Sequence, residues 1–429
     1  MKSDKIIKIK CGKLYDGIKA ELQENMEILI EGEKIVAVGR NLSFPEGTEI
    51  IDLSDATVTP GMIDAHVHPQ FFDWRDTYND TIYYSDGWRA LAVANTVKKS
   101  LAGGFTTIRS VGWFREDYAL DVKRAVEKGY IEGARLIVAP HFMCTPGSHG
   151  DMTQIVSTNP HLADYLQSNY PGCGSGPDFF VNAVRREVKL GADFIKIMAT
   201  GGFATPNDSP EDIQMNDQEF KAIIDTANEL GIPTTAHAYA PNLIQKLVKF
   251  GITGIEHGAL MDEETARMME EHGTYLVPTF MPYEDAIHGD EASITKKSPE
   301  FQRKLKIYKE RLVKGREVII NSKIKLGYGT DFVTVHNAYE HGWEYWAWLN
   351  NGMDPFRALA AATRINAEIC EINDIVGTIE VGKLADISAW KRDLLKDPYA
   401  LMDCAFVMKS GKVYPTECRL PEEVSKQES

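Results

Sequence analysis

The sequence contains no apolar run that approaches the roughly 20 residues of a membrane-spanning helix. Its opening stretch, Met1 to Lys10, alternates lysine with isoleucine and lacks the apolar core of a secretory signal. Basic residues are outnumbered by acidic ones, for a formal net charge of −15, so neither nucleic acid nor an anionic membrane is an expected partner. We therefore expect a cytoplasmic protein.

Cysteine is scarce and scattered. The 429 residues include six cysteines, and no two of them form a Cys-x-x-Cys pair. A zinc finger or a disulfide framework would need cysteines at regular, close spacings, so both are excluded. We expect all six to be free thiols in a reducing compartment.

Both ends of the chain resemble a series of short β-strands. Near the N-terminus, Met26–Ile30 and Lys34–Gly39 alternate apolar and polar residues around a turn at Gly32, which predicts a hairpin. The C-terminal segment has similar strands separated by glycine-containing turns. We predict that residues 1–57 and residues 376–429 together build one small β-sandwich, with a short tail at the C-terminus.

Strand-like and helix-like segments alternate across residues 58–375, as in repeated βα units. Eight strands over this length suit a (β/α)8 TIM-like barrel of the α/β class, whose active site lies at the C-terminal ends of the strands. A doubly wound sheet is the alternative, but it would want a glycine-rich phosphate turn after its first strand, where His66 and His68 stand instead. We expect strands to end near His68, Val111, Pro140, Thr200, Tyr239, Ala259, Phe280 and Phe332, and helices at Asn182–Leu190, Asp217–Leu230, Asp262–Glu271 and Pro299–Val318.

Histidines and an aspartate follow several of these strands. His66 and His68, two residues apart on a strand, would project from the same face. His237, His257 and Asp331 each end a later strand. One such residue alone is usually an ordinary polar group, and Asp331 alone could cap a helix. Together they predict a metal site, because imidazole nitrogen and carboxylate oxygen are ligands that Zn²⁺ accepts, with Fe, Mn or Co as alternatives.

Lys196 lies inside the apolar strand Ile195–Met198, where a lysine is rare unless it is paired. One interpretation is an ion pair with a carboxylate of the barrel. The other is a desolvated amine of lowered pKa, which can react with CO2 to give a carbamate able to bridge two metals. The sequence leaves both interpretations open.

The set of candidate ligands resembles that of the binuclear branch of the amidohydrolase superfamily. The segment Gly382–Asp386 also resembles the one that commonly returns these chains to their sandwich. The resemblance covers nearly the whole chain and rests on six residues in this order: His66, His68, Lys196, His237, His257 and Asp331.

The superfamily resemblance implies a role for each ligand. His66, His68 and Asp331 would hold the more buried of two divalent metal ions, which zinc suits best. His237 and His257 would hold the other, and carboxylated Lys196 would bridge both. Two such cations lower the pKa of a shared water and make a bridging hydroxide available for attack on an amide. Asp331 would be the catalytic residue that takes the proton and passes it to the leaving nitrogen.

Several segments resemble the prolidase-like and Xaa-Arg(Lys) carboxypeptidase-like branch, near the ochratoxin-hydrolysing amidases: Gly147–Asp151, Thr200–Gly202, Ala236–Tyr239 and Glu256–Gly258. Those enzymes cut the last amide bond before a free C-terminal carboxylate, which implies a dipeptide or an N-acyl amino acid as the substrate. The resemblance also implies that Tyr239 and His149 contact the substrate carbonyl or carboxylate, with His141 as a second contact. Relatives are often dimers to octamers, which implies a homo-oligomer.

Two aromatic runs, residues 71–88 and 341–348, are unusual for that branch. Each could line the substrate pocket or pack within the domain or at an interface, so the side-chain specificity stays open. A cyclic amide, as in imidazolonepropionase-like relatives, or another C–N or ester bond is the alternative substrate, although Lys196 counts against those mononuclear branches. A non-enzymatic relative is disfavoured because all six ligand positions are filled.

Overall fold

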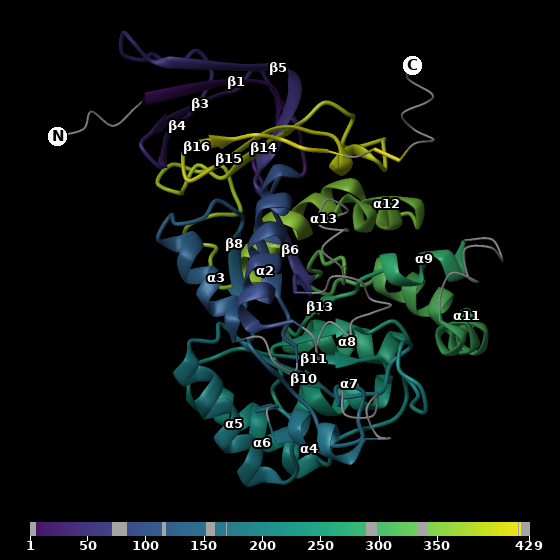
Figure 1. The fold of residues 1–429 in the computed structure, drawn as a ribbon. Coiled ribbons are helices and arrows are strands. Elements are labelled where there is room, and N and C mark those ends of the chain that lie inside the picture. The colour runs from purple at the N-terminus through teal and green to yellow at the C-terminus, as the bar shows by residue number, and fades with distance from the viewer. Residues whose placement is uncertain are drawn as a thin grey trace.

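The computed structural model of the protein describes residues 6–70, 84–113, 117–151, 159–168, 170–288, 298–332, 341–418 and 420–421. The chain is of the α/β class, with parallel strands and covering helices in its middle part (Figure 1). Within the described residues, none of the helices combines the length and the apolar character that crossing a bilayer requires.

Strands from both ends of the chain form one eight-stranded sheet. Figure 1 shows it at one end of the molecule, where the purple N-terminal strands lie beside the yellow C-terminal ones. Its order is β16-β15-β14-β5-β1-β3-β4, with β2 paired to β1, and only the β1–β5 pair is parallel. The strands are β1 (Ile6–Leu14), β2 (Gln23–Glu24), β3 (Glu27–Glu31), β4 (Lys34–Gly39), β5 (Glu49–Pro60), β14 (Ile387–Trp390), β15 (Cys404–Lys409) and β16 (Lys412–Tyr414).

The predicted N-terminal hairpin is confirmed. Strands β3 and β4 pair in antiparallel fashion through Glu31 and Lys34, and Gly32 turns the chain with a φ of 60°. Alternate residues such as Ile28 and Ile30 are fully buried, since a strand places every second side chain on the core face.

The middle of the chain contains two sheets that are entirely parallel. Their residues are almost all buried, as expected where helices cover a parallel sheet. The first sheet has the order β6 (Met62–Val67), β7 (Phe105–Ser110) and β8 (Arg135–Val138). The second has the order β13 (Tyr275–Val277), β12 (Gly254–His257), β11 (Thr234–Ala238), β10 (Ile195–Met198) and β9 (Phe142–Met143).

The expected eighth strand, ending near Phe332, is present only as two isolated parallel bridges. Leu326 pairs with Leu276 of β13, and Phe332 pairs with Val67 of β6. The backbone between them turns at Asp331, whose φ of 54° is left-handed and breaks a regular ladder. The segment 326–332 thus lies between the edge strands of the two parallel sheets, and it carries Asp331 to the C-terminal end of β6.

The helices around the parallel strands begin at residues that suit helix starts. Asn216 and Glu219 form a reciprocal capping box at the start of α6, and Asp262 caps α8. The four predicted helices are confirmed as α5, α6, α8 and α11, with α5 beginning earlier than expected. The helices are α2 (Asp86–Ala102), α3 (Tyr118–Glu127), α4 (Pro160–Ser168), α5 (Pro177–Leu190), α6 (Asp217–Glu229), α7 (Pro241–Lys249), α8 (Glu263–His272), α9 (Met281–Ile287), α11 (Pro299–Asn321), α12 (Gly342–Asn350), α13 (Pro355–Ala360) and α14 (Asn366–Ile369), with a short π-helix at Ala361–Ile365 and a short 3-10 helix at Ala400–Met402.

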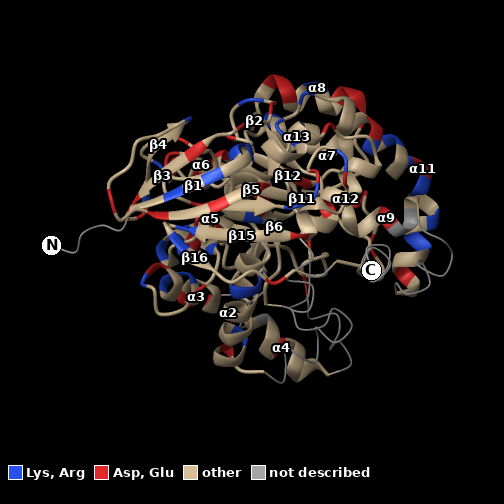
Figure 2. Cartoon of the chain, turned by 90° about the horizontal axis from the view of Figure 1, so that it is seen from above, with Lys and Arg blue, Asp and Glu red and all other residues tan. Residues whose placement is uncertain are grey.

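Charged residues of both signs occur in the outer helices, as the colouring of α8 and α11 in Figure 2 shows. Acidic residues stand at both ends of α8, whereas α11 carries both acidic and basic residues along its length.

Candidate metal centre

Residues from the ends of the parallel strands meet at one place. His66 lies in β6 and His68 directly follows it, and Asp331 reaches them from the neighbouring segment. The Nε2 atoms of His66 and His68 lie 3.4 and 3.5 Å from Asp331 Oδ1. One ligand atom from each of the three residues lies within 4.8 Å of the others, so the cluster could hold a metal ion.

The two later histidines extend this cluster. His237 lies near the end of β11, and His257 is the last residue of the neighbouring strand β12. The centroids of the two imidazole rings are 4.6 Å apart. The His257 ring is 4.9 Å from that of His66, and its Nδ1 lies 4.0 Å from Asp331 Oδ2. The structure therefore brings together the four histidines and the aspartate that were predicted from the sequence.

The electrostatics of the cluster suit a cation. Burial lowers the pKa of His68 to about 3 and holds the pKa values of His237 and His257 well below their usual range. These imidazoles are therefore neutral and can offer a lone pair to a metal ion. Burial would raise the pKa of Asp331, but His66, His68 and Lys196 outweigh it and lower that pKa. The donor set thus fits one or two divalent cations.

Lys196 is buried in β10 beneath the same cluster, with 2% of its surface exposed. Burial lowers its pKa to about 8, against the opposing charges of Glu256 and Asp331. In the part of the chain that the structure describes, no carboxylate oxygen lies within 4.0 Å of its Nζ. The ion-paired interpretation of Lys196 is therefore not the one that the structure has.

Glu256 is a buried carboxylate for which the sequence predicted no role. It stands directly before His257 and is fully buried. It accepts hydrogen bonds from Arg109 Nη2 at 2.6 Å and Thr235 Oγ1 at 2.7 Å, and its Oε2 lies 2.6 Å from His66 Nδ1. The charges of Arg109 and His66 hold its pKa well below the usual range even though burial raises it. A charged Glu256 turns the Nε2 of His66 toward Asp331.

A second buried carboxylate, Asp64, connects β6 to the segment that carries Asp331. It accepts hydrogen bonds from the backbone N–H of Thr330 at 3.2 Å and from its Oγ1 at 2.7 Å, and it lies 2.7 Å from His341 Nδ1. The backbone N–H of His66 also donates to it, at 3.1 Å. Asp64 stands two residues before His66, but its contacts with Thr330 and His341, like those of Glu256, cross between distant segments and had no signal in the sequence.

The backbone is left-handed at three non-glycine residues of the site. His257, Thr279 and Asp331 have φ values of 69°, 45° and 54°. Such conformations cost about 1–3 kcal/mol each and persist where the surroundings enforce them. The Oγ1 of Thr279 lies 2.8 Å from His257 Nδ1, so this residue contacts the ring of a candidate ligand.

The predicted substrate contacts lie at different distances from the cluster. Tyr239 stacks on His257 with ring centroids 5.2 Å apart, and its hydroxyl hydrogen-bonds to that of Tyr283. His149 stacks on His237 at 4.6 Å. His141 is buried, and its Nδ1 lies 3.0 Å from Glu187 of α5. The first two therefore border the rings of candidate ligands, whereas His141 has a hydrogen-bond partner, Glu187, in the helix layer.

Of the two aromatic runs, residues 71–83 lie outside the described residues. In the described remainder of that run, Tyr84 and Trp88 stack at 5.4 Å and are 42% and 49% exposed. In the other run, Trp348 is fully buried and packs against Phe280 and Tyr328 at 6.0 and 5.8 Å. For Trp348 the packing interpretation is the one that the structure has.

A sequence profile described as the Amidohydrolase family matches residues 57–416. The chain belongs to this family, which confirms the resemblance drawn from its strand-end ligands.

Individual relatives agree with the family. Ochratoxinase of Aspergillus niger is 25% identical over 441 residues, which cover 96% of this chain and 87% of that protein. Among solved structures, a Xaa-Pro dipeptidase with bound methionine in its active site matches with a TM-score of 0.84 and 29% identity, over 96% of this chain and 100% of that one. A prolidase complexed with N-methylphosphonate-L-proline matches with a TM-score of 0.84 and 27% identity, over the same shares. The chain is thus a hydrolase, and its relatives support an amide bond as the one it cleaves.

Proposed function

We propose that this protein hydrolyses the amide bond next to a C-terminal carboxylate, in a dipeptide or an N-acyl amino acid, with the help of two divalent metal ions. The observation that carries the proposal is the meeting of His66, His68 and Asp331 within 4.8 Å above a buried lysine. The relatives, a Xaa-Pro dipeptidase, a prolidase and an ochratoxinase, favour this substrate class.

His66, His68 and Asp331 would hold one metal ion, and His237 and His257 the second. Lys196 would bridge them as a CO2-derived carbamate. In support, its burial favours the neutral amine, which is the form that attacks CO2, and no carboxylate oxygen of the described residues lies within 4.0 Å of it. Zinc suits these nitrogen and oxygen donors best. When bound, the cations would polarise the scissile carbonyl and lower the pKa of a water.

Asp331 is the residue we assign to proton transfer. Its side chain is 18% exposed, whereas that of His66 beside it is 1% exposed, so Asp331 can reach both the cluster and the substrate side. Its lowered pKa keeps it ionised and ready to accept a proton from the attacking water. It would then deliver that proton to the leaving nitrogen, because an amine leaves only when protonated.

Tyr239 and His149 would contact the substrate carbonyl or carboxylate, because their rings lie against the ligands His257 and His237. His141 would be a second contact.

The architecture that we propose is a (β/α)8 barrel spanning residues 58–375, flanked by a β-sandwich from residues 1–57 and 376–429. Two features support a closed ring of parallel strands. The segment 326–332 bridges β13 to β6, and β8 leads through residues 139–141 directly into β9. We also propose that the enzyme is cytoplasmic and forms a homo-oligomer.

The test is the release of amino acids from a panel of dipeptides and N-acyl amino acids, with metal-loaded protein and added bicarbonate. Lys196→Ala is the inactive variant. Its matched control is Lys8→Ala, because Lys8 is also buried, at 4% exposed, but pairs with Glu27 in the terminal sheet. Release confined to certain C-terminal residues, lost with Lys196→Ala and kept with Lys8→Ala, is the expected result. If protein with two bound metal ions released no amino acid from any substrate of the panel, the proposal would be contradicted. Cyclic amides and esters would then be the substrates to test.

A further inference from the structure

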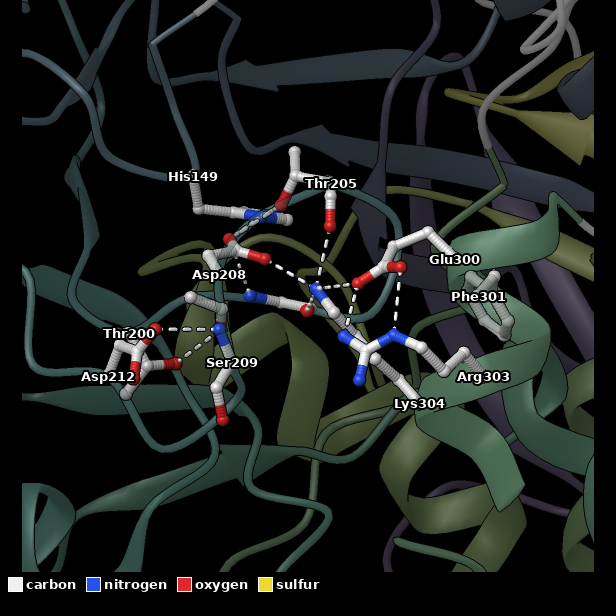
Figure 3. Close-up of polar contacts among 12 residues, drawn as sticks. His149, Thr200, Thr205, Asp208, Ser209, Asp212, Glu300, Phe301, Arg303 and Lys304 are labelled. Carbon is white, nitrogen blue, oxygen red and sulfur yellow. Dashed lines mark hydrogen bonds and ion pairs between the residues drawn. The ribbon is translucent and has the colours of Figure 1, made fainter. Parts of the chain in front are cut away.

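A buried lysine from a distant helix organises the segment that follows β10. Lys304, in the second turn of α11, has a side chain that is 1% exposed. Its Nζ donates to the carbonyl oxygens of Gly202 at 2.7 Å and Thr205 at 2.6 Å, and to Asp208 Oδ1 at 2.5 Å (Figure 3). An ammonium group has three donors, so each is engaged. Lys304 therefore holds this segment and has no donor left for a substrate carboxylate.

The other carboxylate oxygen of Asp208 faces His149. Asp208 Oδ2 accepts from Thr205 Oγ1 at 2.5 Å and from the backbone N–H of Gly202 at 3.1 Å, and it lies 3.2 Å from His149 Nδ1. Burial would raise the pKa of Asp208, but the hydrogen bonds from His149, Lys304 and Thr205 lower it to about 2. An ionised carboxylate only accepts, so the Thr205 hydroxyl donates to it.

The same network orients the His149 ring. Because the Thr205 hydroxyl is used as a donor to Asp208, the Nδ1 of His149, 2.7 Å from Thr205 Oγ1, carries the proton and donates. Nε2 is then the ring nitrogen available to a substrate. The ring is also confined on its flat side, where it stacks on His237 with an interplanar angle of 21°.

Gly202 closes the remaining side of the ring. A Cβ atom at this position would lie 2.2 Å from His149 Cε1, so only glycine permits the ring to lie where it does. His149 is thereby held between a candidate metal ligand, His237, and the segment that Lys304 and Asp208 organise. Figure 3 shows His149 beside Thr205 and Asp208 of that segment.

We propose that Asp208 and Lys304 are positioning residues, which hold His149 against His237 and so set the affinity of the site for substrate. This inference rests on the proposed function, in which His149 contacts the substrate. It adds a part that the strand-end ligands do not contain, because a helix 96 residues further along the chain decides the position of a substrate contact.

The first test compares Asp208→Asn and Lys304→Met with Arg311→Gln. Arg311 is the matched control, because it pairs at 2.8 Å with Glu211 and so links α11 to the same segment, but through half-exposed side chains that do not contact His149. We expect the KM of the best substrate to rise by about ten- to hundredfold in the first two variants, the range of one charge-assisted hydrogen bond, with kcat nearly unchanged. Metal content should stay at the wild-type value, and the control should behave as wild type.

A double-mutant cycle shows whether Asp208 acts through His149. In a His149→Ala background, Asp208→Asn should have no further effect on kcat/KM. An equal loss in both backgrounds, or a fall in kcat that follows loss of metal, would overturn the inference. Lys304→Met alone leaves the buried charge of Asp208 without its partner and could fold poorly for that reason. The double variant Asp208→Asn/Lys304→Met removes both charges and is then measured in its place.

Crystal structures of the same variants supply a readout that needs no turnover. His149 should leave its stacked position on His237 in Asp208→Asn and in the double variant, and keep it in Arg311→Gln. If the wild-type enzyme hydrolysed no substrate of the panel but His149 moved in the variants, only the proposed function would be contradicted. An unmoved His149 would overturn the positioning role itself, whatever the substrate.

Discussion

The buried Glu256 connects stability and metal binding, and its replacement by glutamine gives the sharpest prediction. Glutamine keeps the size of the side chain but removes the charge that Arg109 and His66 share. Arg109 is 1% exposed, and its Nε and Nη1 have no hydrogen-bond partner among the described residues, so Glu256 is the main compensation for its charge. Breaking such a buried pair from one side costs about 3–5 kcal/mol.

The same substitution acts on the metal site. His66 Nδ1 loses the carboxylate 2.6 Å away that orients its ring. Losing such a partner typically weakens metal binding about 10- to 100-fold, which corresponds to about 1.4–2.7 kcal/mol. We therefore expect Glu256→Gln to unfold about 3–5 kcal/mol more easily as metal-free protein, with a further loss once metal is added, since bound metal stabilises only the folded state.

The assay is urea unfolding of metal-free and metal-loaded protein, with metal affinity from competition against a chelator. Glu27→Gln is the control, because it removes the carboxylate 2.7 Å from buried Lys8 in the terminal sheet. The control should lower stability without changing metal affinity. If Glu256→Gln matched the wild type in both the free energy of unfolding and the metal affinity, the orienting role of Glu256 would be refuted.

Four further predictions follow from the site. Lys196→Ala should lower kcat by orders of magnitude without unfolding the protein, which circular dichroism and metal analysis can check. Asp331→Asn should lower kcat similarly, even in preparations with full metal content, since the amide cannot accept the proton; near wild-type turnover would contradict that role. Because burial lowers the pKa of Lys196 to about 8, its neutral fraction rises with pH, reaches one half near pH 8 and saturates above about pH 9. Activation of metal-free protein at a fixed CO2 concentration should therefore speed up between about pH 6 and pH 9 and level off above, and a rate that falls over this range would argue against the carbamate. Gly202→Ala should raise KM while leaving the Asp208 ion pair intact, because its Cβ would displace His149.

Much of the fold was predictable because its signals are local. The hairpin from Met26 to Gly39 and the helices α6 and α11 follow from period-two and helical patterns with turn and cap residues close by in the sequence. The eighth strand could not be predicted as it is, because its backbone is broken at Asp331 by contacts with Asp64 and β6, which lie far away in the chain.

The sequence by itself determined the candidate ligands. Side chains alternate between the two faces of a strand, so a histidine at the end of a strand can point in only a few directions. It also determined the family. Only the tertiary structure decided which groups accompany those ligands: Glu256 on His66, Thr279 on His257, and Lys304 with Asp208 on His149. It also decided that no carboxylate oxygen of the described residues lies within 4.0 Å of the Lys196 amine. These are contacts between segments that are distant in the chain, and a buried charge takes whichever partner the packing brings within about 3 Å, so no local pattern can record them.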